Sequence, residues 1–180
     1  TSAGWTAEGE EFDLAYRWMN ANKDKAYAVD EHFYKSPRWF LENIHRYDSY
    51  DRSLPKVFAG EYAAHTHENT GERVCNWEAA LCEAAFLTGL EHNADHVVMS
   101  CYAPLFGRTG HQQWQPDLIW FDNHSAYGTP SYYVQKLFAN HVGDVLVETR
   151  ISEDGETLSG LAKIAGKSLQ VSSTLSENGL

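Results

Sequence analysis

The sequence predicts a parallel α/β fold followed by a β-rich unit. Short apolar runs of β-type residues alternate with amphipathic helical patterns over residues 1–144, which is typical of parallel α/β architecture. From Val145 onward the aromatic residues disappear, and β-branched and polar residues with glycines take over. In addition, the apolar run Val57–Ala59 leads at once into Gly60 and Glu61, and barrel enzymes present catalytic groups at such strand ends. We therefore divide the chain into residues 1–144 and 145–180.

Four segments form the first half of the α/β part. Apolar residues at helical spacing predict an amphipathic helix over Glu8–Asn20. A short strand follows at Tyr27–Asp30. Ser36-Pro37 begins a helix, with Ser as N-cap and Pro at the first helical position, that weakens near Tyr47. After a polar linker, Lys56–Ala59 is predicted as the next strand.

The second half continues the alternation. Asn76–Leu90 is predicted as a helix that Gly89 closes, since glycine is common just past a helix end. Apolar runs predict strands at Val97–Cys101 and Leu118–Phe121. Thr129-Pro130 then begins a helix that runs through Phe138.

Composition limits the kinds of partner. The net charge of −11 argues against a general affinity for nucleic acid or anionic membranes. No apolar run reaches the length of a membrane span. The six Trp and ten Tyr suit either a ligand that stacks on rings, such as a sugar, or simple core filling. The first residues do not form a signal peptide, and the cytoplasm, the periplasm and secretion all stay open.

Thiol, metal and cofactor chemistry have little support. The three cysteines form no CxxC pair, and the apolar run around Cys101 predicts a buried, inert thiol. His65 and His67 have no third ligand at a usual zinc spacing, so we predict no metal site. No nucleophile elbow, P-loop or dinucleotide fingerprint is present, and no cofactor is expected. Carboxylate chemistry supported by His and Tyr remains.

Two strand ends carry acids flanked by aromatic residues. One is Glu61, and the other is the stretch Asp30-Glu31-His32-Phe33-Tyr34. A strand-end acid often only caps the next turn, but two in succession favour a catalytic interpretation.

Six ordered motifs extend these two strand ends. They are Val29-Asp30-Glu31-His32-Phe33-Tyr34, Val57-Phe58-Ala59-Gly60-Glu61-Tyr62-Ala63, Ala80 to Glu91, Tyr102-Ala103-Pro104-Leu105-Phe106, Trp114-Gln115-Pro116-Asp117-Leu118-Ile119 and Gly128 to Phe138. Together they resemble the retaining α-L-arabinofuranosidases of glycoside hydrolase family 51. The resemblance covers roughly residues 25 to 145.

The resemblance implies a fold and a substrate. Residues 1–144 would be the C-terminal portion of a (β/α)8 TIM barrel, and residues 145–180 the beginning of a β-sandwich domain. The expected activity is hydrolysis of terminal arabinofuranosyl units from arabinan or arabinoxylan. Glu61 matches the catalytic nucleophile of the family, His32 and Tyr34 match a strand end that lines the sugar subsite, and Trp114 lies in a loop that closes the pocket.

The acid/base residue has no match. Retention needs a second carboxyl roughly 5 Å from the nucleophile. The family carries it in an Asn-Glu motif on an earlier strand, and no Asn-Glu pair precedes Glu61. We therefore expect the chain to begin about halfway round the barrel. The half barrel would associate with the rest of the barrel or form a homo-oligomer, since exposed sheet edges are unfavourable.

Two other hypotheses remain open. One is a non-catalytic carbohydrate-binding or structural fragment that lacks the acid/base. The other is a different retaining glycosidase on the same barrel.

Overall fold

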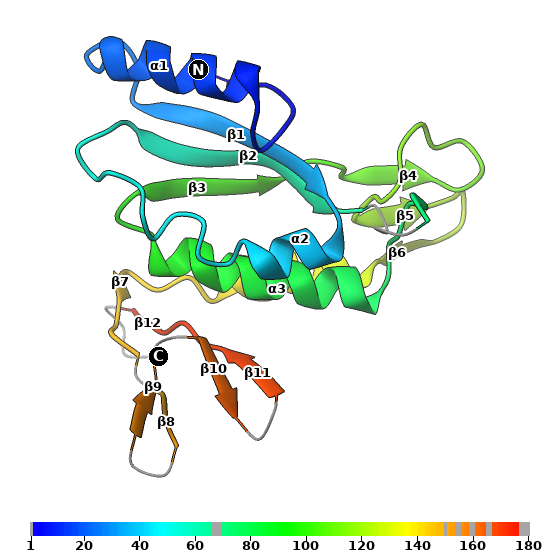
Figure 1. The fold of residues 1–180 in the computed structure, drawn as a ribbon. Coiled ribbons are helices and arrows are strands. Elements are labelled where there is room, and N and C mark those ends of the chain that lie inside the picture. Colours follow the sequence, from blue (N-terminus) through cyan, green and yellow to red (C-terminus); the bar gives the residue numbers. More distant parts are fainter. Residues whose placement is uncertain are drawn as a thin grey trace.

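Mixed α/β structure occupies most of the chain. The computed structural model describes residues 2–65, 70–149, 151–153, 156–158, 161–164 and 167–176, the side chains of 151–170 excepted. Its main sheet has three parallel strands in the order β1-β2-β3 (Figure 1). These are β1 (Ala28–Lys35), β2 (Lys56–Ala64) and β3 (Val97–Tyr102). The predicted parallel arrangement is therefore confirmed for these strands.

Helices flank this sheet. α1 (Glu10–Ala21) packs beside β1, whereas α2 (Pro37–Glu42) and α3 (Trp77–His92) lie along one face of the sheet (Figure 1). α4 (Pro130–Asn140) packs against α3. Three helices begin at side chains that accept a backbone hydrogen bond from the third helical residue, namely Ser36, Asn76 and Thr129. The predicted starts of these helices are confirmed.

An aromatic core joins the sheet to α2 and α3. Phe33 of β1, Phe40 of α2, Tyr62 of β2 and Phe86 of α3 are fully buried. The Phe33 ring lies 5.4 Å from that of Phe86 and 6.0 Å from that of Tyr62. Much of the aromatic content therefore fills the core.

A second, smaller sheet lies near the carboxyl ends of the parallel strands (Figure 1). It consists of β4 (Phe106–Arg108), β5 (Ile119–Phe121) and β6 (Ala126–Gly128). The sequence predicted only the middle strand. Strands of three residues are too short to show an alternating pattern, so the sequence gives no signal for β4 or β6.

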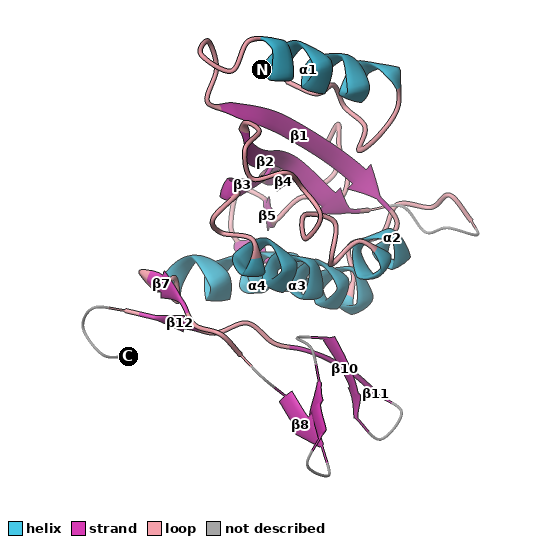
Figure 2. Cartoon of the chain, turned by 60° about the vertical axis from the view of Figure 1, so that its left-hand side comes forward, coloured by secondary structure: helices cyan, strands magenta, loops and turns pink. Residues whose placement is uncertain are grey.

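The described residues after the α4 helix form two-stranded sheets (Figure 2). β7 (Val145–Leu146) pairs with β12 (Thr174–Leu175). The pairs between them are β8 (Ile151–Glu153) with β9 (Glu156–Leu158) and β10 (Leu161–Ile164) with β11 (Lys167–Gln170). The predicted β-structure after Val145 is confirmed for the described residues, while the division into two domains at residue 145 stays a prediction.

Three local expectations were wrong. β2 does not end at Ala59 but continues through Gly60 to Ala64. Gly89 lies inside α3 and does not close it, because the helix runs to His92 and Asn93 is its C-cap. A Cβ on Gly89 would lie 2.0 Å from the backbone oxygen of Ile44, so this glycine permits close packing of α3.

The third error concerns Cys101. Its thiol is exposed and not buried. β3 lies at one edge of the described three-stranded sheet, where an apolar sequence does not guarantee burial.

A buried ion pair fixes β1 to its neighbours. The Glu31 side chain is fully buried, and its Oε2 accepts from Arg46 Nε at 3.2 Å and from the Tyr47 hydroxyl at 2.9 Å. Its Oε1 accepts from the Tyr50 hydroxyl at 3.0 Å and also from the Tyr16 hydroxyl. Every oxygen of this carboxylate is therefore satisfied, which is what a buried charge requires.

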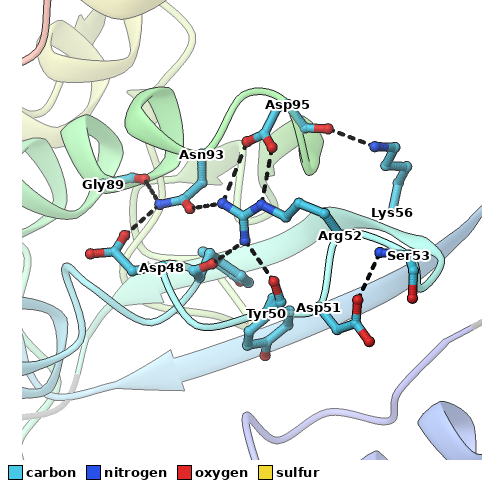
Figure 3. Close-up of polar contacts among 10 residues, drawn as sticks. Asp48, Tyr50, Asp51, Arg52, Ser53, Lys56, Gly89, Asn93 and Asp95 are labelled. Carbon is cyan, nitrogen blue, oxygen red and sulfur yellow. Dashed lines mark hydrogen bonds and ion pairs between the residues drawn. The ribbon is translucent and has the colours of Figure 1, made fainter. Parts of the chain in front are cut away.

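The amino ends of the strands are held by a second polar network (Figure 3). Arg52 donates to Asp95 and Asn93, and to the backbone oxygens of Tyr47 and Tyr50. The Asn93 amide nitrogen donates to Asp48 at 2.8 Å and to the Gly89 oxygen at 2.9 Å. This network ties the segment before β2 to the end of α3.

The sequence predicts no membrane-spanning segment, and the helices of the structure can be compared with this prediction. Within the described residues, none of the helices is both long and apolar enough to cross a membrane.

Candidate active site

A β-bulge in β2 determines the direction of the Glu61 side chain. Glu31 pairs with Ala59, but the next residue, His32, pairs with Glu61, so Gly60 is the extra residue. Ala59 is buried against the core, and strict alternation would place Glu61 on the same face. The bulge reverses the alternation and puts Glu61 on the face that carries His32.

The predicted site residues of β1 contact Glu61 directly. The Tyr34 hydroxyl donates to Glu61 Oε2 at 2.7 Å. His32 Nδ1 lies 3.8 Å from the same oxygen, and its Nε2 lies 2.9 Å from Asp30 Oδ2. Asp30, His32 and Tyr34 alternate along β1 and share one face, so the strand period places all three on the side of the sheet that carries Glu61.

The Glu61 carboxylate is open to solvent on one side. Its side chain is 43% exposed, whereas the His32 side chain is only 16% exposed. The pKa of Tyr34 is raised, first by burial, then by its hydrogen bond to Glu61 and the charge of that carboxylate. The hydroxyl therefore keeps its proton and acts as the donor to Glu61.

Trp114 forms a wall beside this group. Its ring centroid lies 5.7 Å from that of Tyr34 in an edge-to-face arrangement, and 6.0 Å from that of His65. The Arg73 guanidinium lies 4.2 Å from the Trp114 ring centroid and donates to the Gln115 oxygen at 3.1 Å. Stacking and backbone contact by one arginine thus orient the tryptophan.

The structure brings together all four predicted site residues: Glu61, His32, Tyr34 and Trp114. Sequence reasoning assigned no individual role to two supporting side chains, Asp30 and Arg73. Asp30 could have been found, because it stands two residues before His32 and hence on the same strand face. Arg73 gave no local signal, since it is distant from Trp114 in the chain.

Burial lowers the pKa of His65, and the charge of Arg73 lowers it further. The imidazole is therefore neutral at ordinary pH and serves as an aromatic neighbour of Tyr34 and Trp114. Among the described residues, no group of three or more His, Cys, Asp or Glu side chains could hold a metal ion. His67, part of the rejected zinc pattern, lies outside the described residues.

Comparison with known proteins identifies the family. The protein-family model that describes the α-L-arabinofuranosidase C-terminal domain matches residues 60–177, which is more than half of the chain. An arabinose-bound α-L-arabinofuranosidase of glycoside hydrolase family 51 superposes with a TM-score of 0.71 and 32% identity, over 84% of this chain and 24% of that one. The chain belongs to the family 51 α-L-arabinofuranosidases.

The curated relatives include a bacterial and a plant enzyme. An extracellular exo-α-L-arabinofuranosidase of Streptomyces chartreusis is 46% identical over 83% of this chain and 17% of its own length. α-L-Arabinofuranosidase 1 of Arabidopsis thaliana is 41% identical over 72% of this chain and 19% of its own length. The chain thus spans about a fifth of these family 51 relatives.

One more distant structure shares the fold. The arabinose complex of the Thermotoga maritima α-L-arabinofuranosidase superposes with a TM-score of 0.62 at 16% identity, over 93% of this chain and 39% of that one. The fold of this chain is therefore shared by an α-L-arabinofuranosidase of much lower sequence identity.

Proposed function

We propose that this chain carries the nucleophile and part of the sugar pocket of a retaining α-L-arabinofuranosidase. Residues 1–144 would be the C-terminal portion of a (β/α)8 barrel, and residues 145–180 the beginning of a β-sandwich. The substrate is a terminal arabinofuranosyl unit of an arabinan- or arabinoxylan-type polysaccharide. The named activity of the relatives supports this assignment.

One observation carries the proposal. Glu61 is a half-exposed carboxylate that accepts a hydrogen bond from Tyr34 in the carboxyl-terminal half of a parallel strand. Catalytic groups of barrel enzymes gather at that end of the strands. The hydrogen bond from Tyr34 holds one oxygen of the carboxylate in place and leaves the other available for attack.

The chemistry proceeds in two steps. A Glu61 oxygen attacks the anomeric carbon, the glycosidic C–O bond breaks, and the departing oxygen takes a proton from the acid/base. Water then attacks the same anomeric carbon, the bond between that carbon and the Glu61 oxygen breaks, and the acid/base takes the proton from the water, which restores Glu61. The Tyr34 and His32 contacts both involve Oε2, so Oε1 is the attacking oxygen.

The acid/base is proposed to come from outside these 180 residues. Asp30, the nearby carboxylate, is engaged with His32 at 2.9 Å and is a poor donor to a leaving group. Its role would be to orient the imidazole beside Glu61. Trp114 and Tyr34 would pack against the sugar, since aromatic rings suit the apolar faces of sugars.

A substrate panel separates this function from its alternatives. The full-length gene product should hydrolyse 4-nitrophenyl α-L-arabinofuranoside at least about 100-fold faster than the β-xyloside and β-galactoside, because a snug pocket discriminates by several contacts. NMR of the first product should show the retained anomer. Faster cleavage of another glycoside would favour a different barrel glycosidase, and binding without turnover would favour a carbohydrate-binding module.

Gly60→Ala should impair turnover through Asp30. A Cβ at residue 60 would lie 1.9 Å from Asp30 Oδ1, so the carboxylate that holds His32 must move. We expect kcat to fall by about 10-fold or more, since small misplacements at a site are costly. Steady-state kinetics with the aryl arabinofuranoside measures it.

A double-mutant cycle with Asp30→Ala is the control for the Gly60→Ala prediction. If the clash acts through Asp30, Gly60→Ala should cause little further loss in an Asp30→Ala background. Equal losses in both backgrounds would contradict this route.

A further inference from the structure

Glu83 is a buried carboxyl behind the candidate active site. It lies on the inner side of α3, is fully buried, and its Oε1 accepts from the Ala64 backbone nitrogen at 2.9 Å. Within the described residues its Oε2 is buried without a hydrogen-bond partner of ordinary geometry, although the nearby Ser131 side chain favours the charged form. Burying a carboxyl in this way costs free energy, so its hydrogen bond to the Ala64 nitrogen is expected to serve a specific purpose.

The sheet itself leaves the Ala64 N–H unpaired. The His65 nitrogen donates to Lys35 of β1, and successive N–H groups of a strand point in opposite directions, so the Ala64 N–H points toward β3. β3 ends at Tyr102, which pairs with Tyr62, two residues before Ala64. Glu83 therefore replaces the missing strand as acceptor.

We propose that Glu83 is a positioning residue for Glu61: by binding the Ala64 N–H it fixes the carboxyl end of β2, which carries Glu61 three residues earlier. The inference rests on the proposed function. A second contact supports the same strand end from behind, because the Tyr62 hydroxyl donates to Gln135 of α4 at 2.8 Å. Both contacts lie on the core face, opposite the face that carries Glu61.

The charge of Glu83 should matter near neutral pH. Burial raises its pKa to about 7, against the opposing effects of Ser131 and the Ala64 N–H. The titratable groups that face it are Tyr62 of β2, Tyr102 of β3, and Cys75 and Cys82 before and on α3. All are neutral at pH 7, since burial raises the pKa of each. The ionised carboxylate forms the stronger bond to the N–H.

Two variants separate positioning from packing. Glu83→Gln keeps an acceptor for the Ala64 N–H, whereas Glu83→Met keeps the volume and removes the acceptor. With the full-length gene product and 4-nitrophenyl α-L-arabinofuranoside, we expect kcat of Glu83→Met to fall about 10- to 100-fold with KM nearly unchanged. Glu83→Gln should stay within about threefold of wild type at pH 6, and the exposed Glu78→Gln on the same helix is the control.

The pH profile adds a readout that a merely structural role would not move. The ratio of wild-type kcat to that of Glu83→Gln should rise between pH 5 and pH 8, with its midpoint near the Glu83 pKa of about 7. A flat ratio, equal losses in Glu83→Gln and Glu83→Met, or a folded Glu83→Met with kcat within twofold of wild type would each overturn the proposal.

Hydrogen exchange decides the role of Glu83 independently of turnover. Mass spectrometry should show faster amide exchange in the peptide covering residues 61–65 for Glu83→Met than for Glu83→Gln. If arabinofuranosides are not hydrolysed but this difference is present, the proposed function fails and the strand-end contact stands. If exchange is the same in both variants, the positioning role is wrong even where the enzyme is active.

Discussion

Glu61→Gln is expected to lower arabinofuranoside turnover by roughly 10⁴-fold or more, the scale of loss when a nucleophile is removed. The amide keeps the size of the side chain and can still accept from the Tyr34 hydroxyl. It is not a nucleophile, so the covalent step stops. Steady-state kinetics at saturating 4-nitrophenyl α-L-arabinofuranoside measures the loss, and circular dichroism checks the fold.

External azide tests whether Glu61 attacks carbon or acts only through its charge. In Glu61→Ala, azide can enter the vacated space and attack from the same side, which gives an arabinofuranosyl azide of inverted configuration. Glu10→Gln, an exposed acid of α1, is the control and should keep wild-type kcat. Wild-type turnover by Glu61→Gln would refute the nucleophile assignment.

Arg46→Met is expected to destabilise the protein by about 3–5 kcal/mol, because it leaves a buried carboxylate without its cation. Arg46 is also well buried against rings, with its guanidinium 5.2 Å from the Phe12 ring centroid. Met retains much of this packing, so the loss reports mainly the uncompensated charge of Glu31. Denaturant unfolding at pH 7 measures it.

An exposed ion pair provides the matched control. Arg38 donates to Glu42 at 2.7 Å, but the two side chains are 68% and 58% exposed. Arg38→Met should therefore cost no more than about 0.5 kcal/mol. Equal losses of stability for Arg38→Met and Arg46→Met would show that the burial of Glu31 does not determine how much the Arg46 substitution destabilises the protein.

Local signals in the sequence predicted where helices begin, because a capping residue and the proline after it determine the helix start. Ser36 and Thr129 begin their helices because each precedes a proline at the first helical position and caps the first turn. The apolar runs located all three strands of the parallel sheet. Their ends were predicted less well, since β1 continues beyond Asp30, where the predicted strand ended, and runs to Lys35.

The site residues were predicted from the motifs, but their arrangement was not. Alternation counted from Ala59 places Glu61 on the core face, and only the pairing with β1 reveals the bulge at Gly60. The role of Glu83 could not be predicted either, because it also depends on how the strands pair. Its position on α3 predicts an ordinary core residue, and its function as acceptor depends on where β3 ends, which is a property of the tertiary fold.

The network around Asn93 has a consequence for protein engineering. It closes the amino end of the sheet with side chains from residues 48–56 and 93–95 and with backbone oxygens of the same region. None of these groups belongs to the segment that carries Trp114. Grafting a new Trp114 loop from a relative should therefore alter which sugars are accepted without weakening this anchor, and the scaffold is suited to directed evolution of specificity.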